Sequence, residues 1–429
     1  MKTQAKQIVI VGAGLGGLFS AAYLSQLGFK VTLLESHNKL GGLATWYYRL
    51  DRKYLFSVSP HIVPKSLSKY LRQAFGSELS DELIPYPQIY FHKLNHACSF
   101  KKSDYQIFLS SHLGSQDLER VFSPVERDID LSIKDYLDKR IENKDAFYNL
   151  IYLPLSHAKG LSLDSSIQTF YQTLDLFLED GCFGFKSPID VLMKKIKTHL
   201  EAQGVEIKMN KKVEHIQKVQ NLLKIQTHSE TIMADVVLWG ATPQIVFNDL
   251  YPEANFKELS LTKTVSLNQV AMGIRGDTNL SQHTLFLNKA EDSREGYFHF
   301  NSEFSSLIYS SLDKSTDWKN IDETTYKTRK SSLMDHAHKL VEKFYGKLDI
   351  EFTEVSSPKT VEAFTHHYHG AIFGHKSDLD QYLTTMEDKY PGLYFVGARG
   401  EDFSGWLGMA KLAKLTANKC QNFLMEGSL

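Results

Sequence analysis

The sequence predicts an α/β protein with two domains, one of which is a parallel-sheet domain assembled from separated parts of the chain. Residues 8–35 read as a strand, a glycine-rich turn, a helix and a second strand. Residues 391–420 read as a further strand, a second glycine turn and a long helix. The region between them has helical periodicity in some stretches and alternating strand patterns in others, which predicts a second domain of mixed sheet and helices.

The N-terminal unit predicts dinucleotide binding. Gly12, Gly14 and Gly17 have the G-x-G-x-x-G spacing, which allows a tight turn, approach of the backbone to a pyrophosphate and close packing of the helix. The helix directs its free N–H groups at the phosphates. Glu35 ends the second strand, where its carboxylate can accept both ribose hydroxyls and would repel a 2′-phosphate. These features indicate a Rossmann-like domain that favours FAD or NAD over NADP.

Residues 8–29 carry no charge, but three features argue against a membrane span or a secretory signal. Glycines are concentrated between Gly12 and Gly17, and polar side chains such as Tyr23 and Gln26 interrupt the stretch. A β-branched strand also follows at once. We therefore interpret the stretch as part of the nucleotide fold.

A second glycine pair indicates which dinucleotide is bound. After Glu35 the chain reads SHNKLGGLAT, in which Gly41 and Gly42 allow a second close approach of the backbone to a ligand. This continuation resembles the flavin-binding signature of the FAD amine oxidase and phytoene desaturase superfamily. The resemblance implies FAD as the cofactor and a discontinuous FAD-binding domain.

The C-terminal end resembles the last FAD motif of the same superfamily. PGLYFVGA, from Pro391, predicts a buried strand, and GWLGMAKLAK, from Gly405, predicts a glycine turn and a helix. The resemblance implies that the strand ends beside the flavin and that the helix N-terminus faces its N1 and O2 edge, where negative charge accumulates on reduction. It makes Gly397, Leu407 and Gly408 the expected flavin contacts.

Two segments in the middle of the chain are weaker matches. Ile189 to Gln203 predicts a helix, residues 205–219 predict a strand pair, and residues 234–243 predict a strand that returns to the nucleotide fold. Val213 occupies the position at which members of the superfamily contact the adenine. The superfamily usually has a glycine pair before that helix, whereas this chain has Lys-Ser-Pro at residues 186–188, so contacts from this segment stay open.

Residues 357–374, SPKTVEAFTHHYHGAIFG, resemble a segment of the phytoene desaturase, carotenoid isomerase and retinol saturase branch. Residues 54–61, YLFSVSPH, resemble its F-D-x-G-x-H element, although Ser57 replaces the acid and Ser59 the glycine. His61 is therefore a candidate for acid or base catalysis near the flavin, because its ordinary pKa lies near neutrality, or else a structural histidine. The branch implies polyenes, retinoids or similar apolar substrates.

These motifs predict the division of the chain. The FAD-binding domain comprises residues 1–63, 188–248 and 377–429, and the substrate-binding domain comprises residues 64–187 and 249–376. Within the substrate-binding domain the periodicities predict helices over residues 133–150, 165–178 and 326–345, and strands over residues 264–312.

Composition limits the class of protein. A chain of 429 residues that is 42% hydrophobic can bury large cores, and its net charge of −1 gives no global field for nucleic acid, so we expect no DNA or RNA partner. The three cysteines, Cys98, Cys182 and Cys420, lack the spacing of a disulfide framework or a zinc site. A reducing cytoplasm is the simplest location.

Several aromatic and histidine side chains leave two interpretations open. The histidines of residues 366–369 and His375 have no neighbouring carboxylate or cysteine that would complete a metal site, so we expect no metal and interpret them as a wall of the substrate pocket, with His367 and His369 on one strand face. Trp406 and residues 46–48 could stack near the flavin or pack the core. A helix over residues 64–76 could touch a membrane weakly through Leu67, Tyr70, Leu71 and Phe75, or turn them inward.

The leading hypothesis from the sequence is an FAD-dependent oxidoreductase that desaturates, saturates or isomerises carbon–carbon bonds of a small apolar substrate. An amine or amino-acid oxidase of the same superfamily is the first alternative. The second is a non-catalytic lipid-binding escort, similar to the Rab GDP-dissociation inhibitors, although its nucleotide motif would be eroded whereas this one is intact. The oligomeric state stays open.

Overall fold

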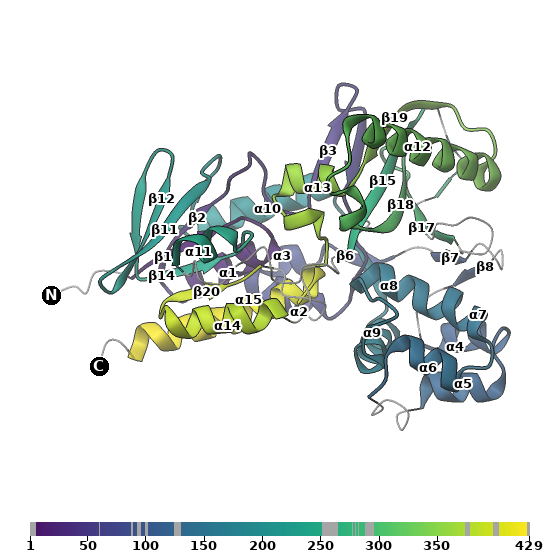
Figure 1. The fold of residues 1–429 in the computed structure, drawn as a ribbon, viewed down its shortest axis with the longest axis horizontal. Coiled ribbons are helices and arrows are strands. Elements are labelled where there is room, and N and C mark those ends of the chain that lie inside the picture. The colour runs from purple at the N-terminus through teal and green to yellow at the C-terminus, as the bar shows by residue number, and fades with distance from the viewer. Residues whose placement is uncertain are drawn as a thin grey trace.

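The structure, a computed structural model, has three parts (Figure 1). The first, here called the nucleotide-type part, contains the parallel sheet and both chain ends, and the other two lie on the opposite side of the molecule. One of these two is a cluster of helices and the other is a large sheet with a long helix beside it. The structure describes residues 6–59, 61–86, 89–91, 96–98, 102–123, 130–250, 265–276, 278, 280–281, 283–287, 296–373, 378–397 and 403–426.

A five-stranded parallel sheet forms the centre of the nucleotide-type part. Its strands come from the start, the middle and the end of the chain, and all neighbours run in the same direction. In spatial order they are β10 (Glu206–Lys208), β2 (Lys30–Leu34), β1 (Gln7–Val11), β14 (Val236–Trp239) and β20 (Leu393–Phe395). This confirms the predicted α/β fold class with a Rossmann-like sheet built from distant segments, while the domain boundaries themselves stay a prediction.

Both faces of this sheet are covered, which explains why the inner strands β1 and β14 are almost continuously apolar. Ile8 and Ile10 are fully buried in a core shared with four helices, α1 (Leu15–Gln26), α2 (Leu67–Phe75), α10 (Ile189–Ala202) and α15 (Gly405–Glu426). Val9 and Val11 point to the opposite face, which packs against the strands β11 (Val213–Val219), β12 (Leu222–Thr227) and β13 (Thr231–Ala234) and the helices α11 (Gln244–Leu250) and α14 (Asp378–Lys389).

The predicted strand pair over residues 205–219 is wrong in its pairing. Both strands exist, but β10 extends the parallel sheet beside β2, and β11 begins a separate antiparallel sheet with β12. The chain changes direction between the two strands at Asn210, whose φ of 56° is left-handed. β11 therefore leaves the parallel sheet, and it buries only Val213 and Ile216 of its seven side chains.

The helical part follows the chain from residue 102 to residue 180. Its elements are α4 (Lys102–Ser110), α5 (Ser115–Phe122), α6 (Ile133–Arg140), α7 (Lys144–Phe147), the π-helix η3 (Tyr148–Tyr152), α8 (Leu153–Lys159) and α9 (Ile167–Asp180). The continuous helix predicted over residues 133–150 is wrong, because Ile141 is extended and ends α6. The buried carboxylate of Asp117 accepts hydrogen bonds from the backbone N–H groups of Glu142 and Asn143 at 2.9 and 2.8 Å. These bonds stabilise the non-helical backbone between α6 and the next helix.

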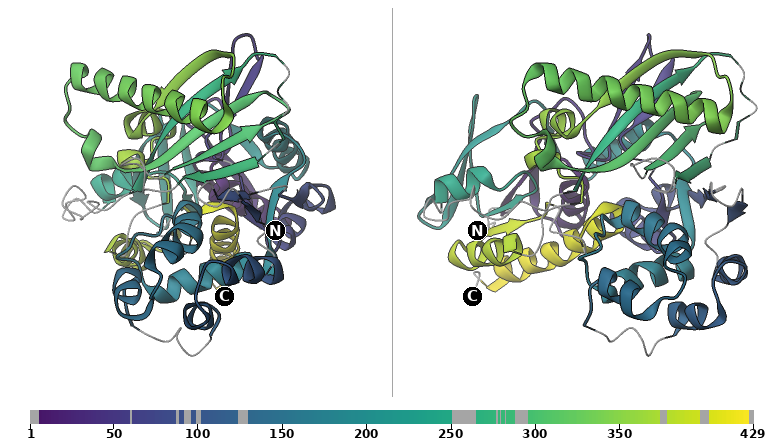
Figure 2. Two further views of the ribbon diagram at one scale, coloured as in Figure 1. Left: turned by 90° about the vertical axis from the view of Figure 1, so that its right-hand side faces the viewer. Right: turned by 45° about the vertical axis from the view of Figure 1, so that its right-hand side comes forward.

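The large sheet has seven strands and carries the helix α12 (Glu323–Tyr345) on its outer face (Figure 2). In spatial order the strands are β19 (Ile350–Ser356), β15 (Val265–Ile274), β18 (Ser306–Lys314), β17 (Gly296–Asn301), β16 (His283–Leu287), β7 (Ile89–Phe91) and β8 (His96–Cys98). The predicted strands over residues 264–312 and the predicted helix at residues 326–345 are therefore confirmed. Together with the helical part, this sheet forms the mixed second region that the sequence predicts.

The remaining elements connect these parts. The hairpin β3 (Trp46–Arg49) and β4 (Tyr54–Ser57) is joined to β19 by Arg49, whose guanidinium donates to both carboxylate oxygens of Glu354 at 2.8 and 2.9 Å. The other elements are β5 (Val63–Pro64), α3 (Ser77–Ser80), β6 (Leu83–Pro85), β9 (Cys182–Phe185), the 3₁₀ turn η5 (Ser315–Trp318), α13 (Pro358–Thr365) and the 3₁₀ turn η6 (Tyr368–Gly370).

The apolar face of α2 points into the protein. Leu67, Leu71 and Phe75 are buried in the core beneath α1, and Tyr70 packs against the same core. Of the two interpretations of this helix, the structure has the one in which these side chains turn inward, and peripheral membrane contact by other parts of the chain stays a prediction. Among the described residues, no helix has both the length and the apolar character needed to cross a bilayer.

Candidate functional site

One cavity of about 600 Å³ connects the glycine turn with the helical part and the large sheet. This size is typical of small-molecule and cofactor sites. Ten of the eleven predicted site residues line it, and these are Gly12, Gly14, Gly17, Glu35, Gly41, Gly42, His61, Gly397, Leu407 and Gly408. The other, Val213, is buried among the side chains under β11 and is not among the cavity-lining residues that the structure describes. Contact of each residue with a cofactor stays a prediction.

The first glycine turn has no room for side chains at two of its three signature positions. Gly12 has a left-handed φ of 97°, and its N–H donates to the carbonyl of Leu34 at 2.7 Å. A Cβ on Gly17 would lie 2.0 Å from the carbonyl oxygen of Gly12, so the helix can pack this closely on the turn only with glycine there. These two glycines build the turn itself.

Gly14 has a different role, because a Cβ there would meet nothing closer than the Cα of Gly42 at 4.0 Å. Its φ of −70° suits any residue, and it is the N-cap of α1. No side chain of the described residues caps this helix, so its first N–H groups stay available to an anion. Gly14 therefore keeps open a space that the protein itself does not fill.

The second glycine pair closes the other side of this space. Gly41 pairs with Gly14 in a short parallel bridge, and its N–H donates to the carbonyl of Ala13 at 2.8 Å. Gly41 and Gly42 have left-handed φ values of 111° and 61°, which glycine adopts at little cost. Two backbone segments thus face one another without side chains between them, as an extended phosphate-containing ligand requires.

Two further glycines are important here, and sequence reasoning missed both. A Cβ on Gly16 would lie 1.9 Å from the carbonyl oxygen of Val396, at the point where α1 passes the end of β20. Gly240 follows β14, and a Cβ there would lie 3.1 Å from the carbonyl oxygen of Val11. The doubled glycine at 16–17 and the Trp-Gly-Ala sequence after β14 were available as signals, but neither reveals its contact partner.

Glu35 supports the turn in addition to its predicted role toward a ribose. Its Oε2 accepts the N–H of Ala13 at 2.8 Å, and its Oε1 accepts the N–H of His37 at 2.7 Å and the hydroxyl of Ser36 at 3.2 Å. A carboxylate has about four acceptor positions, so these three bonds leave capacity for a ligand hydroxyl. The same side chain therefore fixes the turn and lines the cavity.

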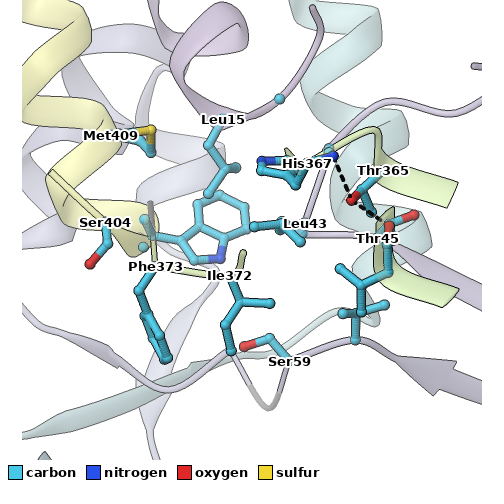
Figure 3. A pocket seen from close by; sticks show the side chains of 18 of the residues that line it. Leu15, Leu43, Thr45, Ser59, Thr365, His367, Ile372, Phe373, Ser404 and Met409 are labelled. Carbon is cyan, nitrogen blue, oxygen red and sulfur yellow. Dashed lines mark hydrogen bonds between the residues drawn. The ribbon is translucent and has the colours of Figure 1, made fainter. Parts of the chain in front are cut away.

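The C-terminal segment faces the glycine segments across the cavity. Figure 3 shows Leu15 and Leu43 from the N-terminal segments, Ser404 immediately before α15, Met409 from the beginning of α15, and His367 from the turn after α13, all around one space. Sequence positions almost 400 residues apart thus line one site, as the sequence predicts. Trp406 also packs in this region, with its ring centroid 4.8 Å from that of Phe185.

His61 is held as a neutral imidazole with a defined tautomer. The Nε1–H of Trp406 donates to its Nδ1 at 3.4 Å, and because an indole nitrogen can only donate, the proton of a neutral His61 is on Nε2. Burial lowers its pKa to about 4. Nε2 is buried and has no hydrogen-bond partner among the described residues, and the residue has a strained, left-handed φ of 51°. At neutral pH the Nε2–H of His61 can donate a hydrogen bond, whereas the low pKa makes the imidazole a weak base.

The histidines of residues 366–369 do not lie on a strand, so the predicted shared face of His367 and His369 is wrong. His366 and His369 have left-handed φ values of 56° and 55°, which fold the chain into a tight turn between α13 and η6. Of the pair, His367 lines the cavity and His369 does not. The wall expected there is thus present in part, and His375 lies outside the described residues. Within the described part of the chain, no group of three or more potential ligands is arranged to hold a metal.

Both described acidic side chains of the cavity accept hydrogen bonds from other groups of the protein. Glu35 accepts two backbone N–H groups, and Glu354 is bonded to Arg49 in a two-point ion pair. The part of the cavity away from the glycines is lined mainly by apolar and aromatic side chains, among them Leu155, Phe177 and Phe286. The arrangement suits a neutral, apolar ligand in this chamber.

The free energy of unfolding is expected to fall as the pH is lowered from 7 to 5. Burial lowers the pKa of His61, His157 and His367 to about 4 and that of His299 to about 3, whereas an unfolded histidine titrates near pH 6.5. The unfolded state therefore binds more protons across this interval, so acid favours unfolding by up to about 2 kcal/mol per histidine.

Urea denaturation at pH 7, 6 and 5 measures this dependence. His299→Phe should flatten it, whereas His228→Gln, at an exposed side chain that follows β12, should leave it unchanged. Equal slopes for the wild type and His299→Phe would contradict the neutral state of the buried imidazoles.

Comparisons with known proteins agree with this geometry. Residues 10–76 match the family model described as an NAD(P)-binding Rossmann-like domain. The chain is 26% identical over 309 residues to 15-cis-phytoene desaturase of Capsicum annuum, a match that covers 60% of this chain and 50% of that enzyme. It is 34% identical over 79 residues to the L-amino-acid oxidase of Naja atra, covering 18% and 15% of the two chains. The chain thus spans about half the length of the desaturase that it matches.

Similarity to solved structures extends over nearly the whole chain. An oxidoreductase from Methanosarcina mazei superposes with a TM-score of 0.66 at 15% identity, covering 96% of this chain and 100% of that one. A fatty acid isomerase from P. acnes superposes with a TM-score of 0.63 at 14% identity, covering 98% and 99%. The chain has the fold of these solved structures. Its parallel sheet and glycine turn form a dinucleotide-binding Rossmann-type domain, and the antiparallel sheet belongs to the second region.

Proposed function

We propose that this chain is an FAD-dependent oxidoreductase that desaturates, saturates or isomerises carbon–carbon bonds of an apolar substrate of the polyene or isoprenoid type. The observation that carries the proposal is the single cavity, which begins at two side-chain-free glycine segments and continues into an apolar chamber. A dinucleotide and an apolar molecule bound there would share one continuous space.

The residues present fit FAD. The uncapped N-terminus of α1 and the glycines Gly14, Gly41 and Gly42 would hold the pyrophosphate, and Glu35 would accept the ribose hydroxyls. At the other end, the first turn of α15 would lie near the ring system, with Leu407 and Gly408 in the cavity wall. The positive end of that helix would stabilise negative charge on a reduced flavin.

The bound flavin would supply hydride or electron transfer, and the protein would orient the substrate, exclude water from the site and donate hydrogen bonds. The apolar side chains of the chamber exclude water and hold a carbon chain by burial. His61, neutral and protonated on Nε2, would donate a hydrogen bond and would not take up a proton at pH 7. The acid or base work expected of His61 is thus replaced in this proposal by a donor role.

An amine or amino-acid oxidase is the alternative, and the partial match to an L-amino-acid oxidase favours it. An amine substrate is mostly a cation at neutral pH and loses hydration on entering a dry site. The described carboxylates of the cavity, Glu35 and Glu354, are bonded to other groups. This charge balance supports an apolar substrate over an ammonium.

Purified protein tests the proposal directly. We expect the absorption spectrum of a bound flavin, and bleaching of that spectrum under anaerobic conditions by a saturated or partly saturated isoprenoid. Redox-neutral isomerisation would instead give a product of unchanged mass, formed only in the presence of a reductant. Bleaching by amines alone would favour the alternative, and a protein that stays colourless after soaking with FAD would contradict FAD binding and favour an escort role.

A further inference from the structure

Among the polar groups of the cavity wall that the proposed chemistry does not use is a histidine of the helical part. His157, on α8, lines the cavity from the helical part, and its Nε2 is buried without a hydrogen-bond partner among the described residues. An unpaired buried acceptor is costly and uncommon in folded proteins. A group of this kind in a cavity wall therefore points to a partner on a ligand.

The tautomer of His157 follows from its other nitrogen. Nδ1 lies 3.0 Å from the carbonyl oxygen of Leu153, which can only accept, so Nδ1 carries the proton. The hydroxyl of Ser156 also donates to this carbonyl, at 2.8 Å, and lies 3.3 Å from Nδ1, where its oxygen can accept. Burial lowers the pKa of His157 to about 4, so the ring is neutral at pH 7. Nε2 is therefore a hydrogen-bond acceptor.

The position of this acceptor is fixed by its surroundings. The ring packs edge-on against Tyr297 and Phe286, with centroid distances of 5.3 and 6.0 Å. α8 follows the π-helix η3, and Pro154 has no N–H for the carbonyl of Leu150, which accepts the hydroxyl of Tyr105 instead. π-Helical turns are frequent at functional sites. His157 is thus held between aromatic rings, with Nδ1 bonded to its own helix and Nε2 left without a partner among the described residues.

We propose that the substrate of this enzyme is an apolar molecule with a hydroxyl group, and that His157 Nε2 accepts the hydrogen bond of that hydroxyl. This inference rests on the proposed function for the apolar part of the ligand. His157 is a specificity-determining residue here, because it would select between an isoprenoid alcohol and the corresponding ether or hydrocarbon. A neutral acceptor between aromatic rings would select against a carboxylate, which has no proton to donate.

Equilibrium dialysis of the full chain, with FAD added, tests the inference with two probes. Farnesol has the hydroxyl, and farnesyl methyl ether has the same carbon chain and oxygen without the proton. We expect the wild type to bind farnesol about tenfold more tightly than the ether, the effect of one hydrogen bond to a buried acceptor. His157→Phe should bring this ratio close to one, and His157→Gln, whose amide oxygen accepts, should restore part of it.

Two controls make the outcomes distinct. His215→Gln removes an exposed histidine and should keep the wild-type ratio, and thermal unfolding of each variant reports whether it folds. A preference for farnesol that persists in His157→Phe would overturn the role of His157. Equal binding of both probes by the wild type would overturn the hydroxyl while leaving the apolar chamber supported, whereas binding of neither would count against the proposed function as well.

Discussion

Gly14→Ala is expected to weaken FAD binding by roughly tenfold to a hundredfold while leaving the ligand-free fold intact. The backbone of Gly14 suits alanine, and a Cβ there would touch the protein only at 4.0 Å. The methyl group would instead occupy the space assigned to the pyrophosphate, and overpacking of this kind costs about 1–3 kcal/mol. Quenching of FAD fluorescence measures affinity, and thermal unfolding without FAD measures the fold.

The matched control is Gly114→Ala. Gly114 is also a helix N-cap with an extended backbone, φ −64° against −70° for Gly14, and a Cβ there would meet nothing within 4 Å. It lies outside the cavity-lining residues, so FAD binding should not change. Gly17→Ala should differ from both by destabilising the ligand-free protein, because its Cβ would collide with the Gly12 carbonyl. Unchanged FAD affinity in Gly14→Ala would place the cofactor elsewhere.

Glu35→Ala is expected to lower the free energy of unfolding of the ligand-free protein by about 1–3 kcal/mol and to weaken FAD binding further. The substitution leaves the buried N–H of Ala13 without its acceptor and also frees the N–H of His37. Glu35→Gln should be nearly as harmful, because the amide presents one N–H donor to another donor. Urea denaturation with and without FAD separates the two effects.

The control for Glu35 is Glu201→Ala, which removes a half-exposed carboxylate paired with Lys197 on the same helix. Exposed pairs of this kind contribute little, so both stability and FAD binding should stay near the wild type. If Glu35→Ala were as stable as Glu201→Ala, the carboxylate would not be supporting the turn. If only its FAD affinity fell, its role would be limited to the ligand.

The sequence predicts the nucleotide half well because its signals are local. A strand, a turn and a helix at residues 8–26 and a second such unit after residue 391 have characteristic periodicities, and parallel strands bring their carboxyl ends to one edge of a sheet. The gathering of Gly12, Gly41 and Gly397 around one cavity follows from that rule.

What could not be predicted depends on contacts between distant segments. The pairing of β10 with β2 is decided by the sheet edge, and the break after α6 by the carboxylate of Asp117, which comes from another helix. The sequence around His157 gives no sign that its ring lines the cavity beside Phe286 and Tyr297 of the large sheet. His367 was expected on a strand, whereas left-handed residues on both sides make a turn.

The order in which the ribosome makes this protein limits when a dinucleotide can be captured. β20 forms one edge of the parallel sheet, and α15 covers α1, yet both follow the other strands of that sheet in the chain. Until they emerge, the nascent polypeptide exposes the edge of β14 and an apolar helix, surfaces that invite aggregation. If the cavity binds FAD as proposed, the complete site forms only after β20 and α15 have been synthesised, and expression in cells poor in riboflavin should yield mostly insoluble product.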